Sequence, residues 1–553
     1  MFVVIFYMLI LYVAISCNSR YKSIKNAVIF SINSYFWRLF GKFNSNFALF
    51  YPFSVFIFAH FGNNLYLCTE FQINIQIVNT FMLIGREKQQ QELLSLLQSD
   101  ESQFCAVYGR RRVGKTYLVK QTFQGQFAFL HSGVANADMN DQLEEFRLSL
   151  LNAGMKRVPK LKSWSLAFFH LEQHLATLPQ TKKIVFIDEM PWMDTPKSRF
   201  VSALEHFWNG WANMRSDIIL IVCGSATSWI IGNIVRNYGG LHNRLTRQIY
   251  LRPFTLKECE QYAQKRALRM PRKSILETYM VLGGIPYYWS LLKQGMSWTQ
   301  NIDQLFFAER GELRNEFDAL YASLFRSPQP YIDIVTALGS KKAGMTREEL
   351  DAAIKNNLGG KLADKLEELE QCDFIRSYNA LGKKKRDTIY QLIDNFTLFY
   401  FKFLANHSID DENFWSISIG KPQYNAWSGL AFERVCMQHS AQIRQALGFA
   451  GISAGIYSWT YRAQNEHEHG VQIDMLINRS DDVINVCEMK FSKGKYEITA
   501  DEFDKLQDKV SVFQNKSKTR KGIHIVMITS YGLSPNAYSY DIPIQLTMDD
   551  LFV

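Results

Sequence analysis

Residues 104–123 read FCAVYGRRRVGKTYLVKQTF. The apolar run at the start predicts a buried strand, and GRRRVGKT fits the phosphate-loop pattern G-x-x-x-x-G-K-[ST]. In that pattern backbone N–H groups surround phosphate oxygens at the N-terminus of a helix. Because a strand is expected before the loop and a helix after it, the segment predicts a nucleotide-binding α/β domain.

The phosphate loop supplies most of the predicted contacts to ATP. Lys115 is expected to neutralise charge on the β- and γ-phosphates, and Thr116 to bind Mg²⁺. The residues predicted to contact the nucleotide are Gly109, Arg110, Arg111, Arg112, Val113, Gly114, Lys115, Thr116 and Tyr117.

A second half of the site follows in KKIVFIDEMPWM, residues 182–193. Four apolar residues predict a buried strand that ends in Asp188 and Glu189. Asp188 is expected to bind Mg²⁺ through water, and Glu189 to polarise the attacking water. A solvated turn is the alternative for such an acidic pair, but the complete phosphate loop earlier in the chain favours a catalytic one.

Polar residues near two further segments are candidates for sensing the nucleotide. The run DIILIVCGSA predicts a strand ending at Ser225, whose side chain could contact the γ-phosphate from a neighbouring strand. Arg244 and Arg247 follow, and one of them could act as an arginine finger, in the same chain or from a neighbouring subunit. A pair of arginines on a solvated turn is an equal alternative.

Several motifs in this order resemble a known family. They are IGREKQQQELLSLL, VYGRRRVGKTYLVK, IVFIDEMPWM, IVCGSA, LTRQIYLRPFT and LGGIPYYWSLL. Together they resemble the AAA+-related ATPases of archaea and bacteria, close to the STAND NTPases, over residues 82–300. The resemblance implies a helical lid in which the turn at Gly283 and Gly284 lies near the nucleotide.

The composition sets the wider frame. The chain has 553 residues, too many for one core, with a net charge of +10 and a pI near 9.0, which favours polyanionic partners. The eight cysteines form no CxxC pair, so we expect reduced thiols and a cytoplasmic protein.

Residues 1–81 differ from the rest. They open with MFVVIFYMLILYVAISC, which has no Lys or Arg ahead of its apolar run. Three interpretations compete: a membrane anchor, a lipoprotein signal, and an over-extended start of translation with the true start at Met82. The third is favoured, so membrane association is expected only if residues 1–17 are genuine.

Helical patterns continue through the middle of the chain. Residues 256–326 predict the lid, and residues 327–400 predict three helices and two short strands that resemble a winged helix. Thr346 and Glu349 form a capping box at the second helix. Lys383 to Arg386 would contact DNA phosphates from the wing, whereas the acidic third helix KLADKLEELEQC favours a protein partner.

Residues 401–553 predict a second site. Glu433 lies on a predicted helix, Asp474 on one strand, and Glu488 and Lys490 on the next, where alternation places both on one face. This set resembles the PD-(D/E)xK nucleases, although Ile473 replaces the proline of the motif, and such a domain is commonly fused to this ATPase type. Asp474 and Glu488 would bind Mg²⁺, and Lys490 would orient water. A salt-bridged strand edge is the alternative.

The sequence therefore predicts a multidomain α/β protein. An AAA+-like ATPase core (82–255), a lid (256–326), a winged helix (327–400) and a restriction-endonuclease-like domain (401–553) follow the N-terminal extension. ATP and Mg²⁺ are the expected ligands and DNA the expected target. The rival is a STAND-type signalling or scaffold ATPase with an inactive nuclease-like domain, acting on a protein partner or as a homo-oligomer.

Overall fold

The computed structural model of the chain describes residues 55–61, 64–71, 83–236, 239–241, 243–354, 358–378, 388–405, 411–461, 463, 465–466 and 468–553. It contains two compact units, Met1–Phe81 and Met82–Val553. In the first unit, strands β1 (Val55–Phe61) and β2 (Asn64–Phe71) pair antiparallel. The apolar segment 1–17 lies outside the described residues. Within the described ranges, no helix is long and apolar enough to cross a bilayer.

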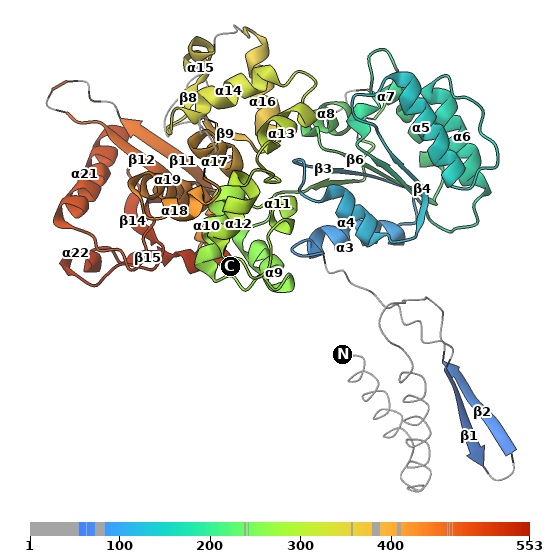
Figure 1. Cartoon of the computed structure of the whole chain (residues 1–553), viewed down its shortest axis with the longest axis horizontal. Helices are drawn as coiled ribbons and strands as arrows, with labels where there is room; N and C mark the ends of the chain where they lie inside the picture. The colour runs from blue at the N-terminus through green and yellow to red at the C-terminus, as the bar shows by residue number, and fades with distance from the viewer. Residues whose placement is uncertain are drawn as a thin grey trace. The chain divides into compact units, whose positions relative to one another are not determined.

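A five-stranded parallel sheet opens the second unit (Figure 1). Its order is β4 (Phe127–Ser132), β5 (Lys183–Asp188), β6 (Ile218–Gly224), β3 (Gln103–Tyr108) and β7 (Arg247–Tyr250). The carboxyl ends of parallel strands meet at one edge, where open α/β sheets bind ligands. The phosphate loop after β3, the acid pair after β5 and Ser225 after β6 therefore share that edge, as the sequence predicts for an α/β nucleotide-binding core.

Helices cover both faces of this sheet. One face, carrying Cys105 and Val107, packs with α3 (Glu87–Ser95) and α4 (Lys115–Thr122). The other, carrying Phe104 and Ala106, packs with α5 (Met139–Asn152), α6 (Trp164–Thr177) and α7 (Phe200–Gly210). Burial on both faces explains why these strands are continuously apolar in the sequence.

A helical segment follows the sheet, as predicted for residues 256–326. It comprises α9 (Leu256–Lys265), α10 (Arg272–Leu282), α11 (Pro286–Ser290), α12 (Trp298–Ile302) and α13 (Glu316–Leu324). The segment also contains the short helical turn η5 (Asp303–Phe307). The short helical turns outside it are η1 (Leu96–Gln98), η2 (Met190–Trp192), η3 (Ala212–Met214), α8 (Thr227–Ile230), η4 (Ile231–Val235) and η7 (Met548–Phe552). Gly284 contacts the strand-to-lid connection so closely that a Cβ there would lie 1.9 Å from the carbonyl oxygen of Phe254.

The next segment has three helices and a small antiparallel sheet. The helices are α14 (Gln329–Gly339), α15 (Arg347–Ala353) and α16 (Lys361–Gln371), and the sheet has the order β8 (Met345–Thr346), β10 (Ile389–Leu392), β9 (Ile375–Tyr378). The predicted capping box of Thr346 and Glu349 is confirmed at the start of α15. The basic stretch 383–386 lies outside the described residues.

The C-terminal part contains a mixed five-stranded sheet. Its strands are β11 (Ala454–Tyr461), β12 (Val471–Arg479), β13 (Val483–Lys490), β14 (Gly522–Thr529) and β15 (Ile544–Thr547), in that order. The first two pairings are antiparallel and the last two parallel. The helices are α17 (Asn395–Phe403), α18 (Phe414–Ser418), α19 (Pro422–Gln438), α20 (Ser440–Ala446), α21 (Ala500–Ser517) and α22 (Ala537–Tyr540). The three strands predicted after the Glu433 helix are confirmed.

A buried histidine joins the lid to this C-terminal part. The Nε2 atom of His439 accepts a hydrogen bond from the backbone N–H of Leu256 at 3.0 Å, and the Nδ1 atom lies 2.8 Å from the carbonyl oxygen of Val435. Burial lowers the pKa of His439 to about 4. The histidine is therefore neutral in the folded protein at neutral pH, although it would take up a proton near pH 6.5 in an unfolded chain.

This histidine is expected to make the protein acid-sensitive. Its stabilising contribution, about 3 kcal/mol, is present above pH 6.5 and is lost as the pH falls toward 4, because the unfolded state binds the proton more tightly. His439→Gln should therefore show a smaller drop in urea midpoint between pH 7.5 and pH 5 than the parent. His206→Gln, at an exposed position, should not change that drop. An equal decrease in urea midpoint in His439→Gln and the parent would show that His439 is not the source of the acid sensitivity.

Candidate nucleotide site and C-terminal acidic site

Two glycines shape the phosphate loop. Gly109 has a φ of +142°, and a Cβ on it would lie 2.3 Å from the carbonyl oxygen of Leu251, at the end of β7. Gly114 has a φ of +90° and precedes α4 as its N-cap. Both backbone conformations are ones that glycine adopts at little cost. The loop can therefore turn tightly between β3 and α4, with the helix N-terminus facing the space that phosphates would occupy.

The lysine and threonine of the motif contact other residues of the predicted site. The Nζ atom of buried Lys115 donates to the carbonyl oxygens of Gly109 at 2.8 Å and Arg110 at 2.9 Å. The Oγ1 atom of Thr116 donates to the Oδ2 atom of Asp188 at 2.7 Å. The two halves of the predicted site, 72 residues apart, therefore meet at one point.

Ser225 contacts the second acid of the pair. Its hydroxyl donates to the Oε1 atom of Glu189 at 2.7 Å, and its backbone N–H donates to the Oε2 atom at 3.3 Å. The strand order explains this contact: β6 lies between β3 and β5, so the end of β6 is adjacent to the Glu189 carboxylate. The predicted contact of Ser225 to a γ-phosphate stays a prediction.

The turn that carries Glu189 is closely packed. Glu189 has a φ of +46°, in the left-handed region that costs a non-glycine residue about 1 kcal/mol or more. A Cβ on Gly133 would lie 2.6 Å from the Glu189 carbonyl oxygen, and a Cβ on Gly224 would lie 2.6 Å from the Pro191 Cδ atom. The glycines that end the neighbouring strands thus make room for this turn, a requirement that the sequence analysis did not recognise.

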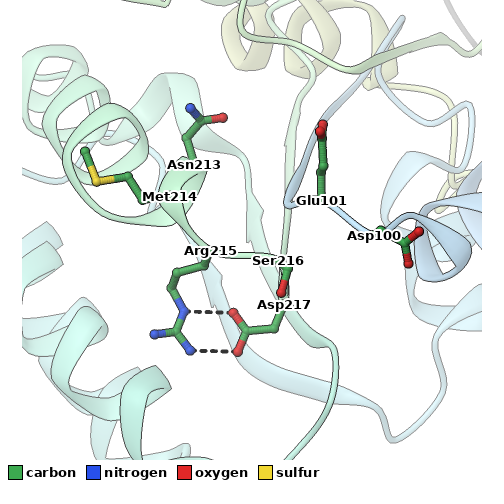
Figure 2. Close-up of a pocket in the computed structure, with 7 residues that line it drawn as sticks. All are labelled: Asp100, Glu101, Asn213, Met214, Arg215, Ser216 and Asp217. Carbon is green, nitrogen blue, oxygen red and sulfur yellow. Dashed lines mark hydrogen bonds and ion pairs between the residues drawn. The ribbon is translucent and has the colours of Figure 1, made fainter.

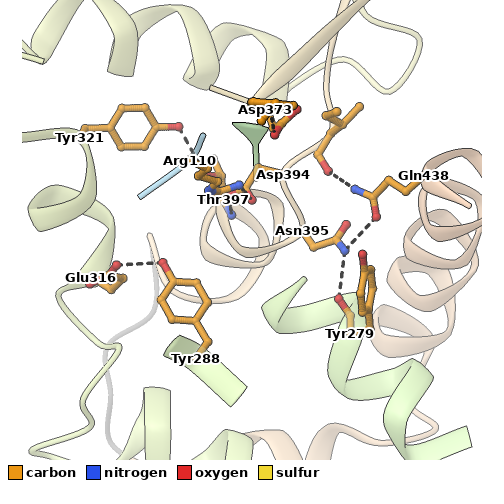
Figure 3. A network of polar contacts seen from close by, with 12 residues as sticks. Arg110, Tyr279, Tyr288, Glu316, Tyr321, Asp373, Asp394, Asn395, Thr397 and Gln438 are labelled. Atoms are coloured by element: carbon orange, nitrogen blue, oxygen red, sulfur yellow. Dashed lines mark hydrogen bonds and ion pairs between the residues drawn. The ribbon is translucent and has the colours of Figure 1, made fainter. Parts of the chain in front are cut away.

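The first arginine of the loop points away from the phosphate-binding face. The Nη1 atom of Arg110 lies 2.5 Å from the Oδ1 atom of Asp394, and both side chains are almost fully buried. Burial alone would lower the pKa of Arg110, but the adjacent Asp394 carboxylate raises it above its usual value. The guanidinium also lies 4.5 Å from the ring centroid of Phe374. Figure 3 shows this pair at the start of α17.

The third arginine contacts the lid. Arg112 forms an ion pair with Glu316 at the start of α13, and its guanidinium lies 4.3 Å from the ring centroid of Tyr287. The Tyr288 hydroxyl donates to Glu316 at 2.8 Å (Figure 3). The backbone N–H of Tyr287 donates to the Arg112 carbonyl oxygen at 3.4 Å. The lid turn after Gly284 therefore contacts the phosphate loop, as the resemblance implies.

The remaining predicted loop residues vary in exposure. Val113 is buried, Arg111 is half-buried, and Tyr117 on α4 is 51% exposed. Nucleotide contacts through the side chains of Arg110 and Arg112 are not favoured by this arrangement, because both guanidinium groups already have acidic partners. Their backbone groups remain part of the loop.

The candidate arginine fingers lie away from the phosphate loop of their own chain. β7 is parallel to β3, with Arg247 opposite Cys105 and Tyr250 opposite Tyr108, where the loop begins. At about 3.3 Å per residue, the Arg247 backbone is about 10 Å short of that edge, and Arg244 precedes it. Both side chains are exposed. A role for Arg244 at a neighbouring subunit's site stays a prediction.

An open depression of about 650 Å³ lies at the opposite, amino edge of this sheet (Figure 2). Arg215 contacts Asp217 there through two hydrogen bonds of 2.7 Å each. The lining residues are Asp100, Glu101, Asn213, Met214, Arg215, Ser216 and Asp217. Because these residues precede β3 and β6 and include three acids, the depression is not the phosphate site.

Comparison with known proteins identifies the nucleotide-binding part. Residues 83–292 match a family described as an ATPase domain predominantly from Archaea. They form a P-loop ATPase domain. The match includes the phosphate loop, the acid pair and the Gly284 turn of the lid.

Three archaeal proteins are similar to this chain. Over 426 residues the chain is 25% identical to an uncharacterized protein of Methanocaldococcus jannaschii, covering 75% of this chain and 88% of that protein. A Walker-type ATPase of Pyrococcus abyssi is 17% identical with a TM-score of 0.42, covering 58% of this chain and 96% of that one. The ORC2 protein of Aeropyrum pernix is 14% identical with a TM-score of 0.37, covering 61% of this chain and 96% of that one.

The C-terminal acidic residues of this ATPase lie on neighbouring elements. Met475 pairs with Cys487 between β12 and β13, so the next position brings Asp474 opposite Glu488. On the other side of β12, Tyr457 pairs with Leu476 and Trp459 with Ile473. Asp474 and Met475 on β12 therefore lie opposite a single residue of β11. This arrangement is a β-bulge, and β-bulges change the direction of side chains at functional sites.

Lysines contact each of the three acids. The Nζ atom of Lys342 lies 2.8 Å from the Oε2 atom of Glu433 and 3.4 Å from the Oδ2 atom of Asp474. Glu488 contacts Lys490 at 3.0 Å and Lys509, on α21, at 2.9 Å. The four predicted residues thus lie in two ion-paired groups on neighbouring elements: Glu433 and Asp474 around Lys342, and Glu488 with Lys490 and Lys509. We refer to the two groups together as the acidic cluster.

The electrostatics of the cluster follow from burial and these charges. Burial, and then the Asp474 charge, raise the pKa of Glu433, with Lys342 acting in the opposite direction. Burial would also raise the pKa of Glu488, but Lys509 and Lys490 together lower it. The carboxylates are therefore close enough to influence one another.

The carboxylates of the cluster are of the type that binds a divalent cation, but they are not arranged around a common metal position. Carboxylate oxygens are the ligands that Mg²⁺ prefers. In the part of the chain that the structure describes, however, no group of three or more His, Cys, Asp or Glu side chains is arranged to hold a metal ion. The Lys342 ammonium group stands between Glu433 and Asp474, and two lysines are paired with Glu488. The predicted metal role of Asp474 and Glu488 stays a prediction.

Some site residues had no usable signal in the sequence. Asp394 reads as the N-cap of α17, a role that it does fill by accepting from the Thr397 N–H at 2.9 Å. Glu316, Lys342 and Lys509 read as ordinary charged residues of helices and turns. Their partners are distant in sequence, so only the packing of the chain reveals the contacts.

Proposed function

We propose that this protein is an ATP-hydrolysing switch whose nucleotide state controls a DNA-cutting, nuclease-like C-terminal domain. The observation that carries the proposal is the meeting of Glu433, Asp474, Glu488 and Lys490 in one cluster of a chain with an assembled P-loop ATPase domain. A helix, two antiparallel strands and a bulge bring these residue types together.

In the ATPase domain, each motif residue has a separate role in ATP binding or hydrolysis. Lys115 binds the β- and γ-phosphates, while Thr116 and Asp188 hold Mg²⁺, which neutralises phosphate charge when bound. Glu189 orients the attacking water and accepts its proton. Its hydrogen bonds from Ser225 fix the position of the carboxylate.

In the C-terminal domain, Asp474 and Glu488 hold Mg²⁺ with help from Glu433. The ion would stabilise the negative charge that develops on a scissile phosphate. Lys490, on the same face of β13 as Glu488, orients the water. The net charge of +10 supports a polyanionic target.

The segment of α14 to β10 acts as a winged helix between the two sites in this proposal. Its order of three helices and an antiparallel sheet supports that assignment. Arg110 and Asp394 connect it to the phosphate loop, since Asp394 follows β10 by two residues. Homo-oligomers in which Arg244 reaches a neighbour's nucleotide would complete the ATP site.

The second candidate function is a STAND-type signalling or scaffold ATPase with an inactive nuclease-like domain. The observation that favours it is the pairing of all three acids with lysines. In that case the acidic third helix α16 supports a protein partner for the winged helix, because its charge repels DNA.

Plasmid cleavage tests the proposal. The full chain is incubated with supercoiled DNA and Mg²⁺ or Mn²⁺, with and without ATP. Cutting is expected to fall at least about 10²-fold in Lys490→Ala and to lose its dependence on ATP in Lys115→Ala. Lys505→Ala, on the exposed face of α21, serves as the control. ATP turnover with no cutting under any condition would overturn the nuclease proposal in favour of the signalling one.

A further inference from the structure

The turn between α14 and β8 reaches the acidic cluster of the C-terminal domain. This turn contains Lys342, whose Nζ atom lies between the Glu433 and Asp474 carboxylates at 2.8 and 3.4 Å. These are ordinary ammonium–carboxylate distances, longer than the about 2.1 Å of Mg²⁺ coordination. A positive charge from another domain thus stands where a cation would join the two acids.

The backbone of this turn is held firmly by its own domain. Gln391 on β10 donates its side-chain N–H to the Lys342 carbonyl oxygen at 2.7 Å, and the Tyr378 hydroxyl donates to the Ala343 carbonyl oxygen at 2.9 Å. Gly344 has a φ of +78°, and a Cβ there would lie 2.4 Å from the Tyr390 carbonyl oxygen. The backbone of Lys342 is therefore placed by the three-stranded sheet, which sets where its side chain can reach.

The acids of the cluster are ion-paired with lysines. Three carboxylates, Glu433, Asp474 and Glu488, are matched by three lysines, Lys342, Lys490 and Lys509. A divalent cation bound between Glu433 and Asp474 would lie close to the Lys342 ammonium group, and the repulsion between the two positive charges favours displacement of the lysine. Lys342 is the lysine that does not belong to the C-terminal domain, so it can leave with another part of the protein.

A short path of one hydrogen bond, three residues of chain and one ion pair joins this turn to the phosphate loop. Gln391, which holds the Lys342 carbonyl, is three residues before Asp394, which binds Arg110 of the phosphate loop. Any displacement of the phosphate loop that moves Asp394 also pulls on the end of β10.

We propose that Lys342 is a built-in cation that occupies the metal position of the acidic cluster and keeps it inactive until the winged helix moves away. The inference deepens the proposed function and rests on it, because the cluster must be a divalent metal site. Withdrawal of Lys342 opens that site, whereas the present arrangement closes it. The apparent metal affinity of the whole protein is then reduced by the fraction of molecules in which Lys342 is bound.

Binding of Mn²⁺ to the full chain, without nucleotide, tests the inference independently of activity. Free Mn²⁺ is measured by electron paramagnetic resonance during titration of the parent protein and of Lys342→Met. Lys342→Met should bind one Mn²⁺ at least about tenfold more tightly than the parent. The gain should disappear when Asp474→Asn is added to Lys342→Met.

Two further variants control for charge and folding. Lys341→Met removes the same charge from the neighbouring residue, whose ammonium contacts Glu349 within its own domain, and should bind Mn²⁺ like the parent. Lys342→Arg keeps the positive charge and should also behave like the parent. Equal Mn²⁺ affinity in Lys342→Met and the parent would overturn the inference, as would a gain that survives Asp474→Asn.

Plasmid cleavage by the same proteins separates this inference from the proposed function. Tighter Mn²⁺ binding by Lys342→Met with no cutting by any variant would support Lys342 as the occupant of a metal site while overturning nuclease activity. Cutting by the parent at the same rate as by Lys342→Met would overturn the inhibitory role of Lys342 and leave the nuclease proposal intact.

Discussion

Glu189→Gln is expected to lower the rate of ATP hydrolysis by about 10²- to 10⁴-fold, the usual contribution of a general base. The amide keeps the size of the side chain and can still accept a hydrogen bond from Ser225, so the turn should stay folded. It cannot accept a proton from water. Nucleotide binding should change little, because Lys115 and Thr116, not Glu189, are the proposed phosphate and Mg²⁺ contacts.

Two measurements check this expectation. Phosphate release gives the hydrolysis rate, and a fluorescent ATP analogue gives the affinity. Glu145→Gln, at an exposed position of α5, removes an equal charge from the same domain and should leave both unchanged. A hydrolysis rate within a few-fold of the parent would show that another group accepts the proton.

Asp394→Asn is expected to destabilise the protein by about 3–5 kcal/mol, because it leaves the buried Arg110 charge without its counter-ion. Asparagine can still cap α17 by accepting from Thr397, as Asp394 does. The loss would therefore come from the unpaired guanidinium and not from the helix cap. Figure 3 shows the pair among other polar side chains, of which Thr397 donates its hydroxyl to Asp394 at 2.6 Å.

A second substitution separates the charge from its surroundings. Arg110→Met added to Asp394→Asn removes the unpaired charge and should recover most of the lost stability, since a methionine can pack in the same volume. The urea midpoints of the parent, of Asp394→Asn and of the double variant rank the three proteins by stability. Identical midpoints for Asp394→Asn and the double variant would show that the ion pair is not what stabilises this junction.

The same pair is expected to connect nucleotide state to the rest of the protein. Arg110 is a loop residue in the sequence pattern, yet its side chain contacts a residue 284 positions later. Arg112 likewise contacts the lid at Glu316. Two of the three arginines in the phosphate loop therefore contact other segments of the chain, Arg110 at the start of α17 and Arg112 in the lid. Through these contacts the loop connects the nucleotide site to both segments.

Local patterns were enough to predict the nucleotide site. The glycines, Lys115 and Thr116 follow an apolar strand, and Asp188 ends another, so their residue types and spacing specify the phosphate loop and the acid pair. The capping box of α15 and the strands that carry Asp474 and Glu488 were also predictable. Each of these features depends on residues within one or two turns or strands.

Contacts between distant segments were not predictable in the same way. The hydrogen bond from Ser225 to Glu189 was not predicted, and it follows from the position of β6 beside β5. Arg244 was a finger candidate, but the parallel register of β7 places it away from its own phosphate loop. In both cases the strand order and register, which a linear pattern does not contain, decided the partner.

The sequence by itself determined that this protein has a P-loop ATPase core and an acidic C-terminal set, because backbone conformation and residue chemistry are local properties. Only the tertiary structure decided what those groups contact. Arg110 meets Asp394 across 284 residues, and Lys342 meets Asp474 across 132. Such pairs form because separately folded segments pack together and their buried charges require partners, and that requirement leaves no trace in sequence spacing.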